Sequence, residues 1–128
     1  MKTTHAIAVA TLVGFAAGAA VTQGLRAQAK APVYQVSEIE LIDAAAYAKE
    51  YAPKAQAEIK AAGGKFLAAG GKVTGIEGDA PKSRLVIIQW DSMDQAQAYR
   101  ASAFFKESLA IRDKYSKFRT MAVEGLAN

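Results

Sequence analysis

The sequence contains no cysteine and only one histidine, His5, and these two scarcities exclude several kinds of chemistry. A chain without cysteine has no disulfide, no thiol nucleophile and no zinc–thiolate site. His5 lies in a segment that we expect to be removed on export, so the mature chain then lacks imidazole as well. A mature chain of this composition excludes Ser-His-Asp hydrolysis, histidine-ligated haem and the iron site built from two histidines and one carboxylate.

Residues 1–29 have the features of a secretory signal peptide. Lys2 precedes Ala6–Val21, an uncharged stretch in which 13 of 16 residues are Ala, Val, Ile, Leu or Phe, and 27–29 is a cleavage site of the A-x-A type. The alternative is an uncleaved membrane anchor, but a spanning helix needs about 20 apolar residues and this stretch is shorter. We therefore expect a cleaved signal and an exported protein, periplasmic or secreted, that has no stable membrane association after cleavage.

The expected mature chain, residues 30–128, is long enough for one domain and not for two. Its formal charge is +2, because Lys2 and Arg26 leave with the signal. The pI of 9.4 is therefore not a sign of a nucleic-acid partner, and we expect none. The densest basic stretch, residues 112–119, is typical of a solvated helix end.

Hydrophobic periodicity and capping residues predict two helical regions and four strands. The expected strands are Val33–Leu41, Lys65–Ala69, Arg84–Asp91 and Phe118–Glu124. The expected helices are Ala44–Ala62, kinked near Pro53 and ended by Gly63-Gly64, and two segments that start after Ser92 and Ser102, the second being Ala103–Tyr115. This β-α-β-β-α-β order predicts an α+β, ferredoxin-like fold with a four-stranded antiparallel sheet and both helical regions on one face.

The third strand contains Leu85–Ile88, a run that is apolar on both faces of the sheet. One face of this strand is expected to lie under the helices, so the other face also needs a cover. The simplest cover is the same sheet of a second copy, which predicts a homodimer with two-fold symmetry.

Several segments together resemble the domain-of-unknown-function 1330 family, which belongs to the dimeric α+β barrel superfamily. The resemblance covers residues 33–126, and the segments that carry it are 63–71 (GGKFLAAGG), 76–81 (IEGDAP), 84–92 (RLVIIQWDS), 102–105 (SAFF), 109–112 (LAIR) and 123–125 (VEG). It implies a dimeric α+β barrel with a pocket between the sheet and the helices. The pocket candidates that it implies are Gly70, Gly71, Glu77, Arg84, Ser102 and Arg112.

Three departures from the family pattern each remove a group that transfers protons. Ala69 stands where arginine is frequent, and Ala62 stands where histidine is frequent. The segment 102–105 replaces the Ser-Pro-Glu-Tyr that is common in the family. Catalysis is therefore less expected for this chain than for the family at large.

The residue types at the candidate positions leave several interpretations open. Glu77 and Arg84 either orient a polar ligand or pair with each other. Arg112 either reaches the pocket mouth or forms a salt bridge on the helix face with Asp113 or Glu107. Tyr51 and Trp90 either line an aromatic cavity or belong to the core.

Other patterns are better explained by structure than by a binding site. The two Gly-Gly-Lys segments lack the spacing of a phosphate-binding loop, and residues 84–90 lack the aromatic motif of RNA-recognition modules. Glu38 and Glu40 share one side of a strand without a third oxygen ligand, so we expect them to face water and expect no metal or cofactor.

Two hypotheses follow for the function. The first is an exported homodimer that binds a small apolar or aromatic molecule without converting it. The second is a cofactor-independent enzyme, monooxygenase- or isomerase-like, that uses Glu77, Tyr51 or Arg84 to handle protons and stabilise an anion.

Overall fold

The computed structural model describes residues 31–127, so the predicted signal peptide lies outside the described residues. The elements in chain order are β1 (Val33–Leu41), α2 (Ala44–Ala46), η1 (Tyr47–Tyr51), α3 (Ala52–Ala61), β2 (Lys65–Ala69), β3 (Arg84–Trp90), α4 (Met93–Arg100), α5 (Ala103–Tyr115) and β4 (Ser116–Glu124). All four predicted strands are present, and both helical regions lie between the strands where they were expected.

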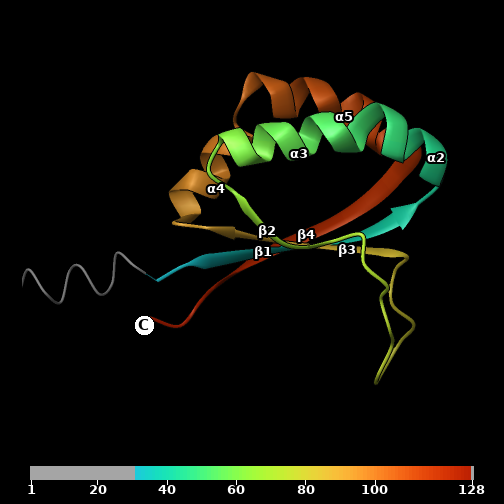
Figure 1. Cartoon of the computed structure of the whole chain (residues 1–128), viewed down its shortest axis with the longest axis horizontal. Coiled ribbons are helices and arrows are strands. Elements are labelled where there is room, and N and C mark those ends of the chain that lie inside the picture. The colour runs from blue at the N-terminus through green and yellow to red at the C-terminus, as the bar shows by residue number, and fades with distance from the viewer. Residues whose placement is uncertain (1–30, 128) are drawn as a thin grey trace, which may run out of the picture. The chain divides into compact units, whose positions relative to one another are not determined.

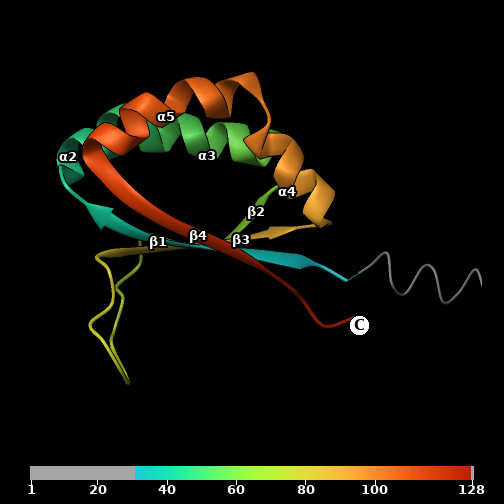
Figure 2. The same ribbon diagram turned by 180° about the vertical axis from the view of Figure 1, so that it is seen from behind.

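The four strands form one antiparallel sheet in the order β2-β3-β1-β4. All the helices lie over one face of this sheet, as the two opposite views in Figures 1 and 2 show. The structure therefore confirms the α+β, ferredoxin-like arrangement. No helix among residues 31–127 combines the length and the apolar character needed to cross a bilayer.

The core lies between the sheet and the helices because alternate strand residues point to the same face. On β1, the buried residues are Val33, Gln35, Ser37 and Ile39. Trp90 at the end of β3 is completely buried, and its ring packs against Tyr99 of α4 with 5.9 Å between centroids. The helix-facing residues of β1 and β3 thus form the floor on which the helices pack.

The predicted helix over 44–62 is divided by a π-helical turn. Asp43 caps its start by accepting a hydrogen bond from the Ala46 amide, and Gly63, with φ of +99°, ends it. The turn η1 separates α2 from α3 just before Pro53, which lies in the first turn of α3. Proline has no amide hydrogen and its ring clashes with the carbonyl four residues earlier, so it fits the first turn of α3 but not the interior of one continuous helix. This explains the predicted irregularity near this residue.

The second helical region begins at two serine caps, as predicted. The Ser92 hydroxyl accepts from the Gln95 amide, and the Gln95 side chain accepts in turn from the Asp91 amide. Ser102 accepts from the Phe105 amide at the start of α5. The last strand begins at Ser116, two residues earlier than predicted, because residues 116 and 117 already pair with the end of β1.

Residues 70–83 connect β2 to β3 without a helix or strand. In Figures 1 and 2 this loop extends from the sheet on the side opposite the helices. The connection therefore leaves the layer in which the cavity described below is found.

Candidate functional site

A cavity of about 50 Å³ lies between the helix-facing side of the sheet and the helices. Its floor comes from β1, β3 and β4, and its walls come from η1, α3, α4 and α5. Ser37 and Thr120 on the floor share a hydrogen bond of 2.9 Å, and Gln35 on the floor accepts a hydrogen bond from Trp90. The rest of the floor is largely apolar, and an apolar lining with a few placed polar groups is the usual composition of a small-molecule site.

Three aromatic rings form one wall of the cavity. Tyr47 and Tyr51, both on η1, lie with their ring centroids 5.3 Å apart. Phe118 of β4 lies 6.3 Å from each of them, nearly perpendicular to Tyr51. The two tyrosines are four residues apart and both are buried, so the helix presents them together toward the sheet.

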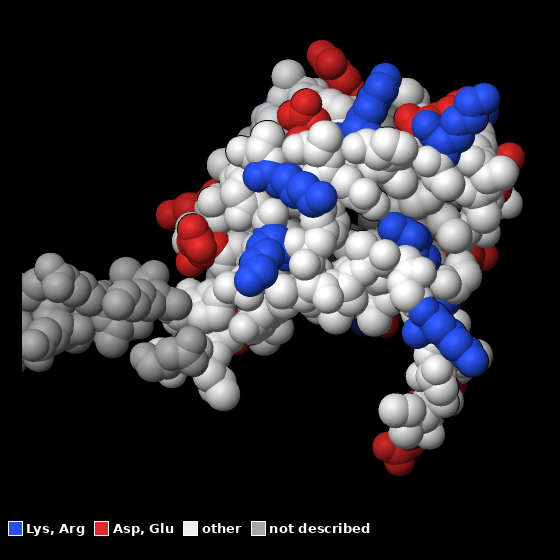
Figure 3. All heavy atoms as spheres, in the orientation of Figure 1, with Lys and Arg blue, Asp and Glu red and all other residues white. Residues whose placement is uncertain are grey.

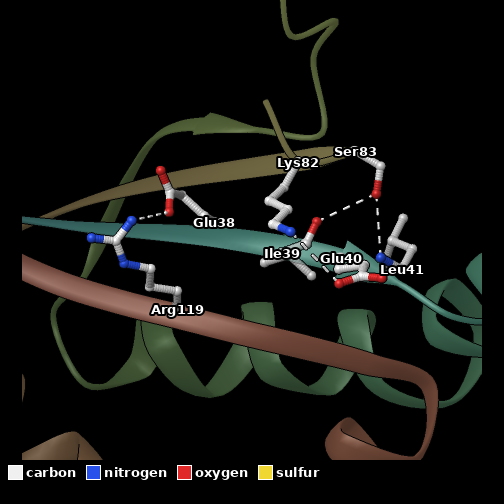
Figure 4. A network of polar contacts seen from close by, with 7 residues as sticks. All are labelled: Glu38, Ile39, Glu40, Leu41, Lys82, Ser83 and Arg119. Atoms are coloured by element: carbon white, nitrogen blue, oxygen red, sulfur yellow. Dashed lines mark hydrogen bonds and ion pairs between the residues drawn. The ribbon is translucent and has the colours of Figure 1, made fainter. Parts of the chain in front are cut away.

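Arg84, the first residue of β3, brings a guanidinium to the cavity. Ser83 fixes this end of the strand, because its hydroxyl donates to the Ile39 carbonyl (3.3 Å) and accepts from the Leu41 amide (3.2 Å), as Figure 4 shows. The Arg84 guanidinium carbon lies 5.5 Å from the Tyr47 ring centroid. Within the described residues, the Nε of Arg84 is buried and has no hydrogen-bond partner.

Arg112 reaches the same cavity from α5. Its guanidinium carbon lies 4.2 Å from the Phe118 ring centroid, and its side chain is only 12% exposed. Its Nε also donates a 2.9 Å hydrogen bond to Asp113. Arg112 thus does both of the things that the sequence analysis offered as alternatives: it lines the cavity, and it forms a salt bridge with Asp113 on the helix face.

The charges that line the cavity are all positive. Arg84, Arg112 and Arg100 are the charged residues among its lining, which includes no Asp or Glu. Arg100 lies over the Phe105 ring, with its guanidinium carbon 4.5 Å from the centroid. In Figure 3, Lys and Arg side chains lie around the middle of the visible face, where the helix layer meets the sheet.

The tyrosines of the cavity stay neutral at physiological pH. Burial raises the pKa of Tyr47, while the nearby charge of Arg84 and then that of Arg112 oppose this rise. Burial raises the pKa of Tyr51 further, with Tyr99 adding to the effect. Burial and, to a smaller extent, Glu58 raise the pKa of Tyr99 to about 12. The phenols are thus hydrogen-bonding groups rather than bases.

The structure brings together some of the candidate residues and separates others. Tyr51, Arg84 and Arg112 line the cavity. A Cβ built on Gly70 would lie 2.5 Å from the Arg84 Nη1, so this glycine makes room for the guanidinium. Trp90 belongs to the core below the cavity, which is the other interpretation given above.

The remaining candidates lie away from the cavity lining. Ser102 caps α5 and borders a different, shallow groove on the helices. Gly71 and Glu77 are exposed in the loop 70–83. Glu77 does not form an ion pair with Arg84 among the described residues.

Glu38 and Glu40 lie on the helix-free face of the sheet, where both side chains are partly exposed. Glu38 pairs with Arg119 at 3.0 Å, and Glu40 pairs with Lys82 at 3.8 Å (Figure 4). Within residues 31–127, no three acidic or histidine side chains come together in a way that would hold a metal ion.

The sequence analysis missed Tyr47 and Phe118 as site residues. Tyr47 lies one helical turn before Tyr51, so its position alone places it on the same face. Phe118 is paired with Ile39, which is buried beneath the helices, but this register is known only from the sheet. Tyr47 could therefore have been predicted from the sequence, whereas Phe118 could be identified only from the strand pairing.

Comparison with protein families gives a match over nearly all of the described residues. The model of the "Domain of unknown function (DUF1330)" matches residues 32–126. The chain belongs to the DUF1330 family. The match confirms the resemblance drawn from the sequence motifs, and it begins one residue earlier than expected.

Solved structures similar to this DUF1330 domain share its fold at low sequence identity. The RPA0582 protein of unknown function from Rhodopseudomonas palustris has a TM-score of 0.63 and 17% identity, covering 82% of this chain and 94% of that one. A conserved protein of unknown function from Bacteroides thetaiotaomicron, described as a possible oxidoreductase, has a TM-score of 0.51 and 13% identity, covering 74% and 98%. No curated protein matches the DUF1330 chain.

Proposed function

We propose that this DUF1330 protein is an exported homodimer that binds a small apolar or aromatic molecule between its sheet and its helices. The observation that carries the proposal is the aromatic wall of Tyr47, Tyr51 and Phe118, which lines a cavity whose floor carries a few polar side chains among apolar ones. Aromatic and aliphatic walls with a few placed polar groups favour a small organic ligand. The predicted signal peptide supports export, which gives such a binder access to molecules outside the cytoplasm.

The size of the cavity indicates how the ligand enters. A cavity of about 150 Å³ holds a benzene molecule, whereas this one measures about 50 Å³. Tyr51 also borders a second hollow, about 460 Å³, that lies between the first helical region and α5. The Tyr51 ring is thus a shared wall, and a rotation of this side chain joins the two spaces into a site large enough for an aromatic ring.

The helix-free face of the sheet supports the homodimer. On β3, Leu85 and Ile87 point to this face and are only half-buried, and on β4 Met121 and Val123 are exposed. Glu38 and Arg119 bring both charge signs to the same face. A face that is apolar at its centre and carries both charges is self-complementary, as a two-fold interface requires.

Binding is favoured over catalysis because the cavity offers poor proton-transfer groups. Glu77, the base of the enzyme hypothesis, lies in the exposed loop, and the tyrosines that line the cavity have raised pKa values. One fold neighbour is described as a possible oxidoreductase, which agrees with the enzyme hypothesis only at the level of the fold. A ligand recovered chemically unchanged after incubation supports binding, and a turned-over one supports the enzyme.

Native mass spectrometry of the protein purified from its own host tests all parts of the proposal. We expect a dimer of chains that start near residue 30, each carrying a small organic molecule. An unliganded monomer would contradict both the dimer and the binding role. A chain that retains residues 1–29 would contradict signal cleavage and support the alternative of an uncleaved membrane anchor.

Two substitutions of alanine by leucine test where the ligand lies. Ala55 is buried in the cavity lining, and Ala110 is exposed on α5. Ala55→Leu fills the cavity, so it is expected to abolish retention of the ligand, whereas Ala110→Leu keeps it. Overpacking at a buried site costs about 1–3 kcal/mol, so circular dichroism must show that Ala55→Leu is folded. Retention by a folded Ala55→Leu protein would place the ligand elsewhere.

Charge substitutions test the dimer face separately. Ile87→Lys and the milder Val123→Lys each place a charge on the helix-free face, and Ala110→Lys places the same charge on the outside of the helices. Light scattering after size exclusion is expected to show monomers for the first two and a dimer for Ala110→Lys. Dimers for all three variants would move the interface to another surface.

A further inference from the structure

The cavity lining has a charge imbalance that an apolar ligand does not explain. Three guanidiniums border the cavity, while the described chain contributes no carboxylate to its lining. Asp113 offsets only Arg112, and it does so from a position whose side chain is 57% exposed. Arg100 is exposed, whereas Arg84 and Arg112 are half-buried, so an anionic ligand would offset the positive charge most effectively at these two residues.

We propose that the ligand carries a carboxylate, which binds between Arg84 and Arg112 while its apolar part packs on the aromatic wall. This inference rests on the proposed function, because it assumes that the cavity is the binding site. It adds the chemical class of the ligand, a small aromatic or aliphatic carboxylic acid in its ionised form.

Arg84 has the unsatisfied group that such an anion would bind. Its Nε is buried and makes no hydrogen bond within the described residues, although nearly all buried donors in proteins are paired. Gly70 gives the guanidinium room, and the Ser83 hydrogen bonds to β1 fix the strand end from which the side chain projects. The donor is thus positioned by the fold and left without a partner. A guanidinium with an unpaired Nε–H matches a carboxylate, because a carboxylate can accept two parallel hydrogen bonds from one guanidinium.

Arg112 is held in place before any ligand arrives. The Phe118 ring lies beneath its guanidinium, and Asp113 accepts from its Nε. The Nε bond to Asp113 leaves the remaining guanidinium donors for other partners. Arg84 and Arg112 act from different elements, one on β3 and the other on α5.

Tyr47 contacts Arg84 directly and Arg112 through Phe118, and its hydroxyl adds a third donor. Arg84 lies over its ring, and Phe118 joins Tyr47 to Arg112 through ring contacts. The charge of Arg84, a hydrogen bond from its side chain and the charge of Arg112 each lower the pKa of the Tyr47 hydroxyl. Burial nevertheless keeps Tyr47 neutral, so its O–H remains able to donate to an anion.

The volume of the cavity fits the acidic group rather than a whole ligand. A cavity needs about 10–15 Å³ of such space to hold one water, so about 50 Å³ has room for only a few non-hydrogen atoms. A carboxylate is a group of this size. The ring or chain that bears it then lies against Tyr51 and extends toward the larger hollow beside it. The lining of that hollow includes the apolar Phe104 and Ile111, and also Glu50, Glu58 and Glu107.

Benzoate and its uncharged near-isostere benzamide provide the test, with binding measured by calorimetry on protein freed of its ligand. We expect benzoate to bind at least tenfold more tightly than benzamide and to raise the thermal unfolding midpoint. Arg84→Met and Arg112→Met are each expected to remove this preference. Arg119→Met is the matched control, because Arg119 lies on the helix-free face in a pair with Glu38. This variant is expected to bind benzoate as the natural chain does.

The outcomes separate this inference from the proposed function. Equal binding of benzoate and benzamide would overturn the carboxylate and leave the cavity as an apolar site. Binding of neither compound would overturn the carboxylate inference and, for single-ring ligands, the binding site itself. A benzoate preference that survives in both the Arg84→Met and the Arg112→Met variants would place the anion elsewhere.

The stability of the free protein gives a second readout. Because Arg84 has no anionic partner in the described structure, Arg84→Met is expected to leave the unfolding midpoint of the ligand-free protein unchanged or to raise it. Arg84→Lys keeps the charge and is expected to restore part of the benzoate preference. A large drop in the midpoint of Arg84→Met, without rescue by Arg84→Lys, would show that Arg84 is a packing residue.

Discussion

The indole Nε1 of Trp90 donates a hydrogen bond of 3.1 Å to the side-chain oxygen of Gln35, and both residues are buried beneath the helices. The two residues lie on neighbouring strands, β3 and β1, on the helix-facing side of the sheet. Trp90 is the largest completely buried side chain of the described residues, and its only polar atom is satisfied by this bond. The pair fixes the end of the sheet that supports α4.

The first prediction concerns this pair. Gln35→Leu leaves the indole N–H buried without an acceptor, so we expect the free energy of unfolding to fall by about 1–3 kcal/mol. In a Trp90→Phe background the same change is expected to cost much less, because the donor is already gone. Urea denaturation of the four proteins in this cycle measures the coupling. Additive effects would show that the bond contributes nothing.

The second prediction compares two adjacent glycines. Gly70 has φ of +85° and lies against the Arg84 guanidinium, whereas no atom lies within 4 Å of a Cβ built on Gly71, whose φ is not positive. Gly70→Ala is expected to destabilise the protein by about 1–2 kcal/mol, because alanine is strained in the left-handed region. Gly71→Ala is expected to have little effect. Thermal unfolding of the two variants measures the difference. Equal midpoints would contradict a special backbone requirement at Gly70.

The third prediction assigns Ser102 a structural role. Its hydroxyl caps α5, so Ser102→Ala is expected to lower the free energy of unfolding by about 1 kcal/mol. Ser102→Asp keeps an acceptor for the Phe105 amide and is expected to restore much of the loss. Benzoate binding by both variants is expected to match that of the natural chain. Loss of binding without loss of stability would make Ser102 a ligand contact after all.

The fourth prediction concerns alkaline pH and Tyr99. Burial raises the pKa of this phenol to about 12 from 10.0, and within residues 31–127 its hydroxyl has no hydrogen-bond partner. The unfolded chain therefore loses its proton at lower pH than the folded chain. The contribution of Tyr99 to stability is complete below pH 10 and is lost as the pH rises toward 12.

Tyr99→Phe isolates this contribution, because phenylalanine keeps the ring and does not titrate. We expect the urea midpoint of the natural chain to fall more steeply between about pH 9 and about pH 11.5 than that of Tyr99→Phe. Near neutral pH the variant is expected to be at least as stable, since it removes an unsatisfied buried hydroxyl. Parallel pH profiles would contradict the raised pKa.

The elements of the fold were predictable because their signals are local. The alternation along Val33–Leu41, the serine caps at Ser92 and Ser102 and the position of Pro53 each specify the backbone within a few residues. The candidate site was predicted only in part. Arg84 and Arg112 were identified, but Glu77 was grouped with them and lies in a loop on the other side of the sheet. Sequence proximity to Arg84 does not determine the direction in which a loop of this length leaves the sheet.

The sequence by itself determined the strands, the helices, the absence of thiol chemistry and the membership of a family, because each depends on residue types or on short-range spacing. Only the tertiary structure decided that Arg84, Arg112 and Tyr47 share one cavity that no acidic residue lines. These three residues come from a strand, a helix and a π-helical turn that are far apart in the chain. Their meeting depends on strand register and helix packing, which bring distant groups together and leave their charges to be balanced by a ligand.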